Sequence, residues 1–373
     1  MKILSTGNQI RNFLGIEPLQ TITLRVTKAC NLRCLQCYSI SGTKLKDELS
    51  FEEIKNIIDQ SKKLGAIRIF FTGGEPFMRS DILEILKYAD DNNFAIYIST
   101  NGTLLNKDIV KSLNSLKHLR TLQISIDGLE KIHDTIRSIR GTFNKAIAST
   151  KLIKKEFKNN KNTKITFILT LMEKNKDEIG KVFKLAIALG VDVFALVPLY
   201  PVKRSNNAED IPVKEKYKIF QELCKIYQEE KPKTKLGLLV PPALIPKPLQ
   251  EIEYGCGYVC TFPSMIGVDA NGDVAPCDGL LNYKNFILGN IRKDSLEKIW
   301  NHHLMKKLRK IKPNNLKGVC KKCQHLSFCM GGCRARAFIE YGNFEAPNPL
   351  CQSFYNNSLF PKKSLKGKNY FKN

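Results

Sequence analysis

"TITLRVTKACNLRCLQC", residues 21–37, places a short apolar run directly before three cysteines. The run at 21–27 is rich in β-branched residues, which predicts a strand. Cys30, Cys34 and Cys37 then share one compact loop. A structural zinc site needs a fourth ligand, whereas closely spaced thiolates also suit an iron–sulfur cluster. In a four-iron cluster with three protein ligands, one iron keeps an open position that a substrate or cofactor can bind.

Similar strands alternate with longer amphipathic segments along the first 200 residues. Strands are predicted at 67–73, 95–101, 121–127, 165–171 and 191–197, and helices at 51–64, 82–92, 107–116, 142–157 and 176–189. Ser50 and Glu53 form a capping-box pattern at the first helix. The alternation predicts an α/β fold, namely a parallel sheet with helices outside it. Six such strands predict an incomplete TIM-type barrel, a partial (βα)6 unit, whose chemistry lies after the carboxyl ends of the strands.

Three more short motifs follow those strand ends. "TGGEP" (72–76) follows the second strand, "STNG" (99–102) the third and "SIDG" (125–128) the fourth. Glycine and asparagine at a strand end can be ordinary turn residues. Four unusual loops at the same mouth of a barrel, the cysteine loop included, favour a functional site instead.

The second half of the chain has a different character. Residues 201–255 are rich in proline and are interpreted as a bridge with one helix near 214–230, and 256–355 form a small cysteine-rich α+β module. The barrel is expected at 21–200, after an N-terminal extension at 1–20 and before a basic tail at 356–373. The module holds Cys256, Cys260, Cys277, Cys320, Cys323, Cys329, Cys333 and Cys351. On spacing alone, these thiols could form two zinc-ribbon sites, with His325 as a substitute ligand.

Composition sets further bounds on location and partners. The sequence shows no signal peptide and no apolar run long enough for a membrane span, so the cytoplasm is the expected compartment. Twelve cysteines in a reducing compartment indicate metal or catalytic sites rather than disulfides. The net charge of +25 is spread over the predicted helices, which argues against a nucleic-acid partner, although 302–312 and 361–373 are locally basic.

The loop of Cys30, Cys34 and Cys37 resembles the signature of the radical S-adenosylmethionine (SAM) enzymes. The resemblance implies that these cysteines hold a 4Fe-4S cluster whose open iron binds SAM, and that reductive cleavage of SAM gives a 5′-deoxyadenosyl radical. It also implies SAM contacts at the positions that match the motifs of this family. These are Gly73, Gly74, Glu75, Pro76, Ser99, Asn101, Ser125 and Arg137. Gln36 departs from the family, which often has an aromatic residue before the third cysteine.

The C-terminal cysteine spacing resembles the SPASM domain that accompanies many radical SAM enzymes. This implies two auxiliary 4Fe-4S clusters and therefore three clusters in the chain. One set of ligands would be Cys256, Cys260, Cys277 and Cys333, and the other Cys320, Cys323, Cys329 and Cys351. Without Cys256, the first cluster would keep an open iron. Asp278 matches a general base of the sulfatase-maturating branch, although it could equally be a turn residue in "PCDGLL".

SPASM proteins mostly modify ribosomally made peptides or proteins, by crosslinking, epimerising or oxidising a side chain. That makes a peptide the first substrate hypothesis, with flavodoxin or ferredoxin as electron donor. Only about 20 residues precede the first strand, so we expect either a separate leader-peptide-binding protein as a partner or binding of the peptide through the bridge. The stretch "CMGGCRARAFIEYGNFEAPNPLC" also resembles SPASM proteins of haem and haem-d1 synthesis, which makes a tetrapyrrole the alternative substrate. A third possibility, of another class, is a non-enzymatic zinc-ribbon protein that binds nucleic acid.

Overall fold

The computed structural model describes residues 18–200, 208–246, 249 and 264–366. Its centre is one ten-stranded sheet in the order β10-β9-β8-β1-β2-β3-β4-β5-β6-β7. The strands are β1 (Thr21–Arg25), β2 (Arg68–Thr72), β3 (Ala95–Thr100), β4 (Leu119–Ser125), β5 (Lys164–Leu171), β6 (Val193–Pro198), β7 (Lys235–Leu238), β8 (Met265–Val268), β9 (Asp273–Ala275) and β10 (Gly289–Asn290). All pairs from β8 through β1 to β7 are parallel, which confirms the predicted α/β partial barrel.

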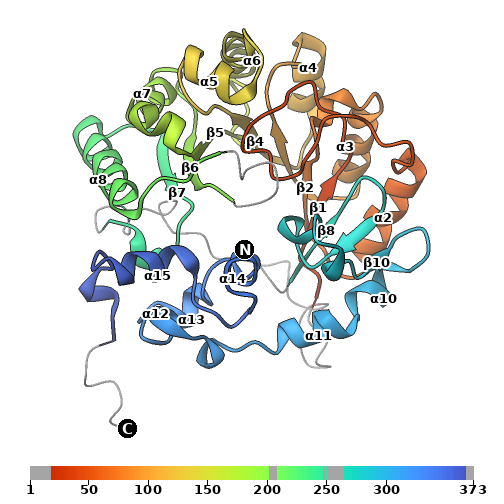
Figure 1. Cartoon of the computed structure of the whole chain (residues 1–373). Coiled ribbons are helices and arrows are strands. Elements are labelled where there is room, and N and C mark those ends of the chain that lie inside the picture. The colour runs from red at the N-terminus through yellow and green to blue at the C-terminus, as the bar shows by residue number, and fades with distance from the viewer. Residues whose placement is uncertain (1–17, 201–207, 247–248, 250–263, 367–373) are drawn as a thin grey trace.

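Helices cover the outside of this sheet (Figure 1). Around the barrel they are α2 (Phe51–Lys63), α3 (Ile82–Asp91), α4 (Lys107–Ser115), α5 (Glu130–Arg137), α6 (Thr142–Glu156), α7 (Ile179–Ala188) and α8 (Val213–Glu230). The predicted capping box is present at α2, where Ser50 and Glu53 exchange hydrogen bonds. The later helices lie across the remaining side of the ring in Figure 1. They are α10 (Leu296–Trp300), α11 (His303–Arg309), α12 (Gly318–Lys321), α13 (Leu326–Cys329), α14 (Arg334–Tyr341) and α15 (Pro349–Asn356).

β7 and β8 are two of the four strands of the sheet that were not predicted from the sequence, the others being β9 and β10. β7 lies inside the stretch interpreted as a bridge and pairs with β6, and β8 pairs in parallel with β1. The cysteine-rich module therefore begins by extending the barrel sheet. β7 and β8 have four residues each, which is too short for a period-two pattern to be recognised.

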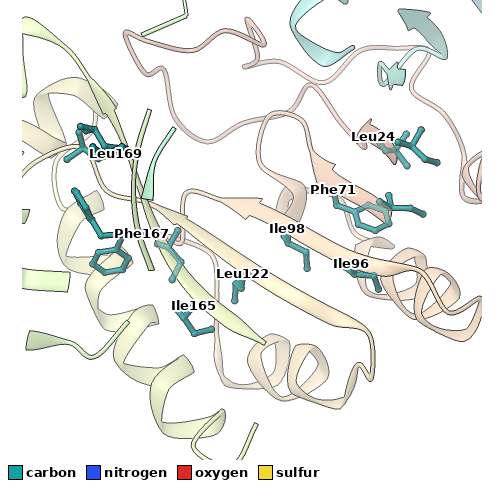
Figure 2. Packing of buried hydrophobic residues seen from close by; sticks show 14 of the residues in the cluster. Leu24, Phe71, Ile96, Ile98, Leu122, Ile165, Phe167 and Leu169 are labelled. Carbon is teal, nitrogen blue, oxygen red and sulfur yellow. The ribbon is translucent and has the colours of Figure 1, made fainter. Parts of the chain in front are cut away.

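The two faces of the sheet differ in burial. Along β1–β5, alternate apolar side chains are buried against the helices, and Figure 2 labels several of them, from Leu24 in β1 to Leu169 in β5. The intervening side chains face the other way, toward the inside of the barrel, and most of them are only partly buried. They are Arg68, Phe70, Thr72, Ala95, Tyr97, Ser99, Thr121, Gln123, Ser125, Lys164, Thr166, Ile168 and Thr170. Arg68 and Lys164 lie at the amino ends of β2 and β5, so the inner face is mainly neutral and polar toward the carboxyl ends of the strands. Phe70 stacks on Tyr97 with 4.4 Å between the ring centroids.

None of the described helices is long and apolar enough to cross a membrane.

Candidate active site

The three-cysteine loop lies at the carboxyl end of β1 and closes on itself. The backbone N–H of Cys30 donates to the carbonyl of Gly42 at 2.9 Å, and that of Gly42 donates to Lys28 at 2.8 Å. Cys34 is buried, while Cys30 and Cys37 are partly buried. Burial raises the pKa of the Cys30 thiol to about 11 and also raises that of Cys34. A metal cation would overcome this penalty, because coordination deprotonates a thiol.

Gly73 and Gly74 bring the "TGGEP" loop into backbone contact with this segment. A Cβ at Gly73, which has φ +144°, would lie 2.4 Å from the carbonyl oxygen of Thr27. At Gly74 it would lie 2.0 Å from the carbonyl oxygen of Ala29. Since no other residue type leaves that room, the backbone N–H of Gly74 can donate to Thr27 at 2.7 Å and that of Glu75 to Ala29 at 2.8 Å.

Glu75 is a buried carboxylate, 1% exposed, held at the base of this contact. It accepts hydrogen bonds from Thr100 Oγ1 at 2.7 Å and from the backbone N–H of Asn101 at 2.7 Å. Burial raises its pKa to about 7 despite these hydrogen bonds. No ion pair with Glu75 occurs within the described residues. A buried carboxylate in this position suits a ligand group that donates hydrogen bonds, such as an amino group.

The "STNG" segment links the loops to one another. Asn101 Nδ2 donates to Asn31 Oδ1 of the cysteine loop at 2.9 Å. Ser99 lies on the inner face of β3 and donates to Gln123 Oε1 at 2.8 Å. Ser125 ends β4 on the same face, partly buried, and Pro76 begins a 3-10 turn directly after Glu75. The predicted SAM contacts from "TGGEP", "STNG" and "SIDG" therefore lie at the same end of the barrel as the cysteine loop.

Arg137 pairs with a residue that the sequence analysis missed. Its Nη2 lies 2.5 Å from Oδ2 of Asp127, which is fully buried, and its Nη1 lies 3.6 Å from Cys34 Sγ. Gln36 Nε2 donates to the same Asp127 oxygen at 2.5 Å. The only available signal for Asp127 was its place after a strand, within "SIDG".

Two buried polar atoms beside Asp127, Gln36 Oε1 and Arg137 Nε, have no hydrogen-bond partner among the residues that the structure describes. Such atoms are costly unless a ligand or water satisfies them. One is an acceptor and the other a donor, so a polar molecule next to Cys34 could pair with both. These orphaned atoms and the Glu75 carboxylate fit the polar groups of SAM.

Asp278 does begin a turn, the 3-10 segment Asp278–Leu280, and its side chain is paired. Arg25 of β1, which is 0% exposed, donates from Nε to Asp278 Oδ1 at 2.6 Å and from Nη2 to the carbonyl oxygen of Asp278 at 2.9 Å. Arg25 also lies 3.5 Å from Asp269, which in turn pairs with Lys28 at 3.0 Å. Sequence reasoning missed Arg25, because a cation within an apolar strand gives no indication of its partner.

The cysteines predicted for one auxiliary cluster line a common pocket. Cys320, Cys323, Cys329 and Cys351 come from α12, the loop after it, α13 and α15, and they line one pocket together with His325 and Asn348. Burial raises the pKa of Cys329 to about 11 and raises that of the other three thiols. No group of three or more His, Cys, Asp or Glu side chains in the described part of the chain lies close enough to hold a single metal ion. The four thiols share one pocket, and four cysteine ligands are the set that a 4Fe-4S cluster takes.

Half of the other auxiliary ligand set is described. Cys277 and Cys333 both pack against the same small hydrophobic cluster, which contains Ala275, Leu280 and Ala335. Cys256 and Cys260 lie outside the described residues. The structure therefore brings together the two members of this set that it describes.

Two family descriptions match the chain. Residues 24–186 match the Radical SAM superfamily, and residues 260–324 match SPASM, an iron–sulfur cluster-binding domain. The first range contains the three-cysteine loop and the Glu75, Asp127 and Arg137 groups. The second contains Cys260, Cys277, Cys320 and Cys323.

Among curated proteins, the chain is similar to synthases and maturases. It is 30% identical to "AdoMet-dependent heme synthase" of Methanosarcina barkeri, over 88% of this chain and 95% of the relative. It is 28% identical to "Mycofactocin maturase MftC" of Mycolicibacterium smegmatis, over 95% of this chain and 88% of the relative.

Solved structures share the fold. Streptococcus suis SuiB bound to its precursor peptide SuiA matches with a TM-score of 0.71 at 18% identity, covering 92% of this chain and 78% of SuiB. The protein anSMEcpe with bound AdoMet matches with a TM-score of 0.69 at 21% identity, covering 91% of both chains. At these identities the likeness concerns architecture alone.

Proposed function

This chain belongs to the radical SAM superfamily and carries a SPASM domain, and from that premise we propose that it modifies a side chain of a ribosomally made peptide or protein. It is an enzyme whose domains imply 4Fe-4S clusters and SAM. The non-enzymatic zinc-ribbon alternative is wrong on this finding. The modification would be a crosslink, an epimerisation or an oxidation, beginning with removal of one hydrogen atom.

Different residues at the mouth of the barrel would hold the first 4Fe-4S cluster and SAM. Cys30, Cys34 and Cys37 would hold the first cluster, which supplies the electron that cleaves SAM to a 5′-deoxyadenosyl radical. Glu75 would accept hydrogen bonds from the amino group of SAM. Arg137, already oriented by Asp127, would use its unpartnered Nε, while Gly73, Gly74, Pro76, Ser99, Asn101 and Ser125 would shape the surrounding wall.

The other eight cysteines would hold two auxiliary clusters, in the sets expected from the SPASM resemblance. Their support is the shared pocket of Cys320, Cys323, Cys329 and Cys351 and the common packing of Cys277 and Cys333. We keep the division into a barrel at 21–200, a bridge at 201–255 and a SPASM domain at 256–355. Asp278 could act as a general base only after leaving Arg25, so we assign it first a positioning role.

We choose a peptide over a tetrapyrrole because the inner face of the barrel is mainly uncharged near the carboxyl ends of its strands. Toward the carboxyl ends of β2 to β5, where the site lies, the partly buried side chains are hydroxyl, amide, aromatic and aliphatic groups, whereas the cations Arg68, Arg120 and Lys164 lie at or near the amino ends of their strands. The nearby cations Arg25 and Lys28 are paired with Asp278 and Asp269. A surface of this kind suits amide groups and uncharged side chains better than several carboxylates. A peptide-bound neighbour with the same fold is consistent with this choice.

A tetrapyrrole is the second candidate. It is favoured by the 30% identity with a protein named as a haem synthase, which spans nearly the whole of both chains. The net charge of +25 would also attract a substrate that bears several carboxylates.

A paired incubation separates the two candidates. The anaerobically reconstituted enzyme is given SAM, dithionite and either the precursor peptide encoded next to its gene or iron-coproporphyrin III. We expect 5′-deoxyadenosine and a mass change in the peptide, measured by mass spectrometry. A mass change in the porphyrin with an unaltered peptide would overturn the peptide proposal in favour of the tetrapyrrole.

A further inference from the structure

The segments that hold Cys320, Cys323, Cys329 and Cys351 are rich in lysine and arginine, and their nearest acidic residues in the sequence are Glu340 and Glu345. Between Lys298 and Ile339 the sequence has no aspartate or glutamate, and it has none after Glu345. Lys321 and Lys322 follow Cys320 directly, at the end of α12, and both are exposed. The general excess of lysine in this chain is elsewhere mixed with acidic residues, so this region differs from the other helices.

A segment near the C-terminal end adds three more lysines to the same place. Leu365 forms an antiparallel bridge with Cys323, and the backbone N–H of Lys366 donates to the carbonyl oxygen of Lys322 at 2.8 Å. The backbone N–H of Gln324 donates to Ser364 at 2.9 Å. This pairing places Lys362, Lys363 and Lys366, all exposed, beside the cysteine loop. We call the five side chains Lys321, Lys322, Lys362, Lys363 and Lys366 the lysine surface.

An exposed aromatic residue accompanies these charges. Phe328 of α13 is 59% exposed, although it directly precedes Cys329, one of the residues that line the pocket. It has the greatest exposed fraction of the large apolar side chains in the described residues. Protein interfaces usually have an apolar centre surrounded by a polar rim, and Phe328 among lysines has this arrangement.

We propose that the lysine surface with Phe328 is the docking site of a small acidic one-electron carrier protein, which exchanges an electron with the cluster in the pocket beneath. The proposal rests on the proposed function, because it needs a cluster held by Cys320, Cys323, Cys329 and Cys351. Opposite charges steer the encounter and Phe328 supplies the short-range contact. The backbone contacts of Cys323 with Leu365 hold the docking surface rigidly over the cluster site.

Nucleic acid fits this surface less well. All five cations are lysines, which bind as point charges, and the surface lacks the arginine fork that suits phosphates. Stacked bases would require several exposed aromatic rings, whereas Phe328 is the exposed ring on this short helix. Nucleic-acid binding would also give no reason for a redox cluster directly beneath the surface, whereas an electron carrier needs one.

The test follows electron transfer to an acidic flavodoxin. In the Cys30→Ala/Cys34→Ala/Cys37→Ala background only auxiliary clusters remain. After reduction with dithionite and its removal, each reduced cluster gives one electron to oxidised flavodoxin. The flavin takes up that electron and a solvent proton to become the neutral semiquinone, which is followed by stopped-flow absorption.

Charge reversal should slow this reaction. We expect Lys321→Glu/Lys362→Glu/Lys366→Glu to lower the second-order rate constant about tenfold or more at low ionic strength, with the difference vanishing at high salt. The matched control is Lys111→Glu/Lys151→Glu/Lys155→Glu, which changes the same charge on exposed positions of α4 and α6 and should leave the rate nearly unaltered. Phe328→Ala should slow transfer at every salt concentration.

Several outcomes would overturn the proposal. If both triple variants slowed electron transfer equally, the effect would be one of net charge alone. If Lys321→Glu/Lys362→Glu/Lys366→Glu left the rate unaltered, the lysine surface would not be the docking site. Loss of binding to duplex DNA in a gel-shift assay, with an unaltered flavodoxin rate, would assign the surface to nucleic acid. Iron and sulfide analysis precedes the kinetics, so missing auxiliary clusters would be recognised separately as a failure of the proposed function.

Discussion

Glu75 is the residue whose ionisation should control SAM binding near neutral pH. Its pKa is raised to about 7 by burial, so the carboxylate is ionised above that pH and protonated below it. The ionised form is the better acceptor for an amino group. The affinity for SAM should therefore rise as the pH increases through 7.

This predicts a dissociation constant for SAM that is up to about tenfold lower at pH 8 than at pH 6. Anaerobic equilibrium dialysis of the cluster-loaded enzyme measures it. The Glu75→Gln variant should bind SAM more weakly and lose this step of the pH profile. An identical pH profile in the variant would show that Glu75 does not contact the ligand.

Gln36 should act as a positioning residue through Asp127. It donates to that buried carboxylate and leaves Oε1 unpartnered. We expect Gln36→Leu to raise the dissociation constant of SAM about fivefold to tenfold, the equivalent of one hydrogen bond to or near a charged group. Gln36→Glu should be worse, because it sets a second carboxylate against Asp127. Unaltered SAM affinity in Gln36→Leu, with normal iron content, would contradict this role.

Single residues were predicted unevenly from the sequence. The cysteines could be found because their spacing is rare and depends on a short loop. Asp127 and Arg25 could not be found, because their roles depend on partners that are distant in the sequence. Asp127 pairs with Arg137, and Arg25 pairs with Asp278. Arg137 was expected to contact SAM, and its pairing with Asp127 is visible only in three dimensions.

At the scale of elements, the contact between the "TGGEP" loop and the cysteine loop depends on Gly74. We expect Gly74→Ala to lower the thermal unfolding midpoint and to weaken both iron retention and SAM binding. The reason is that a Cβ there would meet the Ala29 carbonyl oxygen at 2.0 Å, and such overpacking costs about 1–3 kcal/mol. Differential scanning fluorimetry and iron analysis measure these effects.

Gly237→Ala is the matched control for that substitution. Gly237 lies in β7 with its nearest neighbouring atom at 3.8 Å from a Cβ, an ordinary contact distance. It should therefore be tolerated. If both alanine variants kept wild-type stability and iron content, the two loops would not depend on close backbone contact.

Long elements were predicted well and short ones were missed. The six predicted strands and the helices between them occur within a few residues of their expected bounds. The region 176–189 is helical only from Ile179, after a 3-10 segment at Glu173–Glu178. β7, β8 and α5 were not predicted, since four to eight residues hold too little periodic signal. The short helix α5 nevertheless carries Arg137.

At the scale of the whole molecule, Arg25 and Asp278 tie the barrel to the SPASM domain. Arg25 is fully buried in β1, and Asp278 directly follows Cys277. Removing one partner leaves a buried charge, which costs about 3–5 kcal/mol, whereas replacing both by apolar residues is often nearly neutral. The pair is thus a structural link whose two halves should be strongly coupled.

We therefore expect Arg25→Met to lower the thermal midpoint by several degrees and Arg25→Met/Asp278→Leu to recover most of the loss. A double-mutant cycle of unfolding midpoints measures the coupling. Additive losses would show that the two side chains act independently. If the double variant is stable and cleaves SAM but no longer modifies substrate, Asp278 also has a role in the chemistry.

The most direct test of the account compares SAM cleavage and iron content in the wild type and in Cys30→Ala/Cys34→Ala/Cys37→Ala. The reconstituted wild type should hold about twelve iron atoms with matching sulfide and form 5′-deoxyadenosine from SAM. The triple variant should keep about eight iron atoms and form none. Continued formation of 5′-deoxyadenosine by the variant would contradict the claim that these three cysteines hold the cluster at which SAM is cleaved.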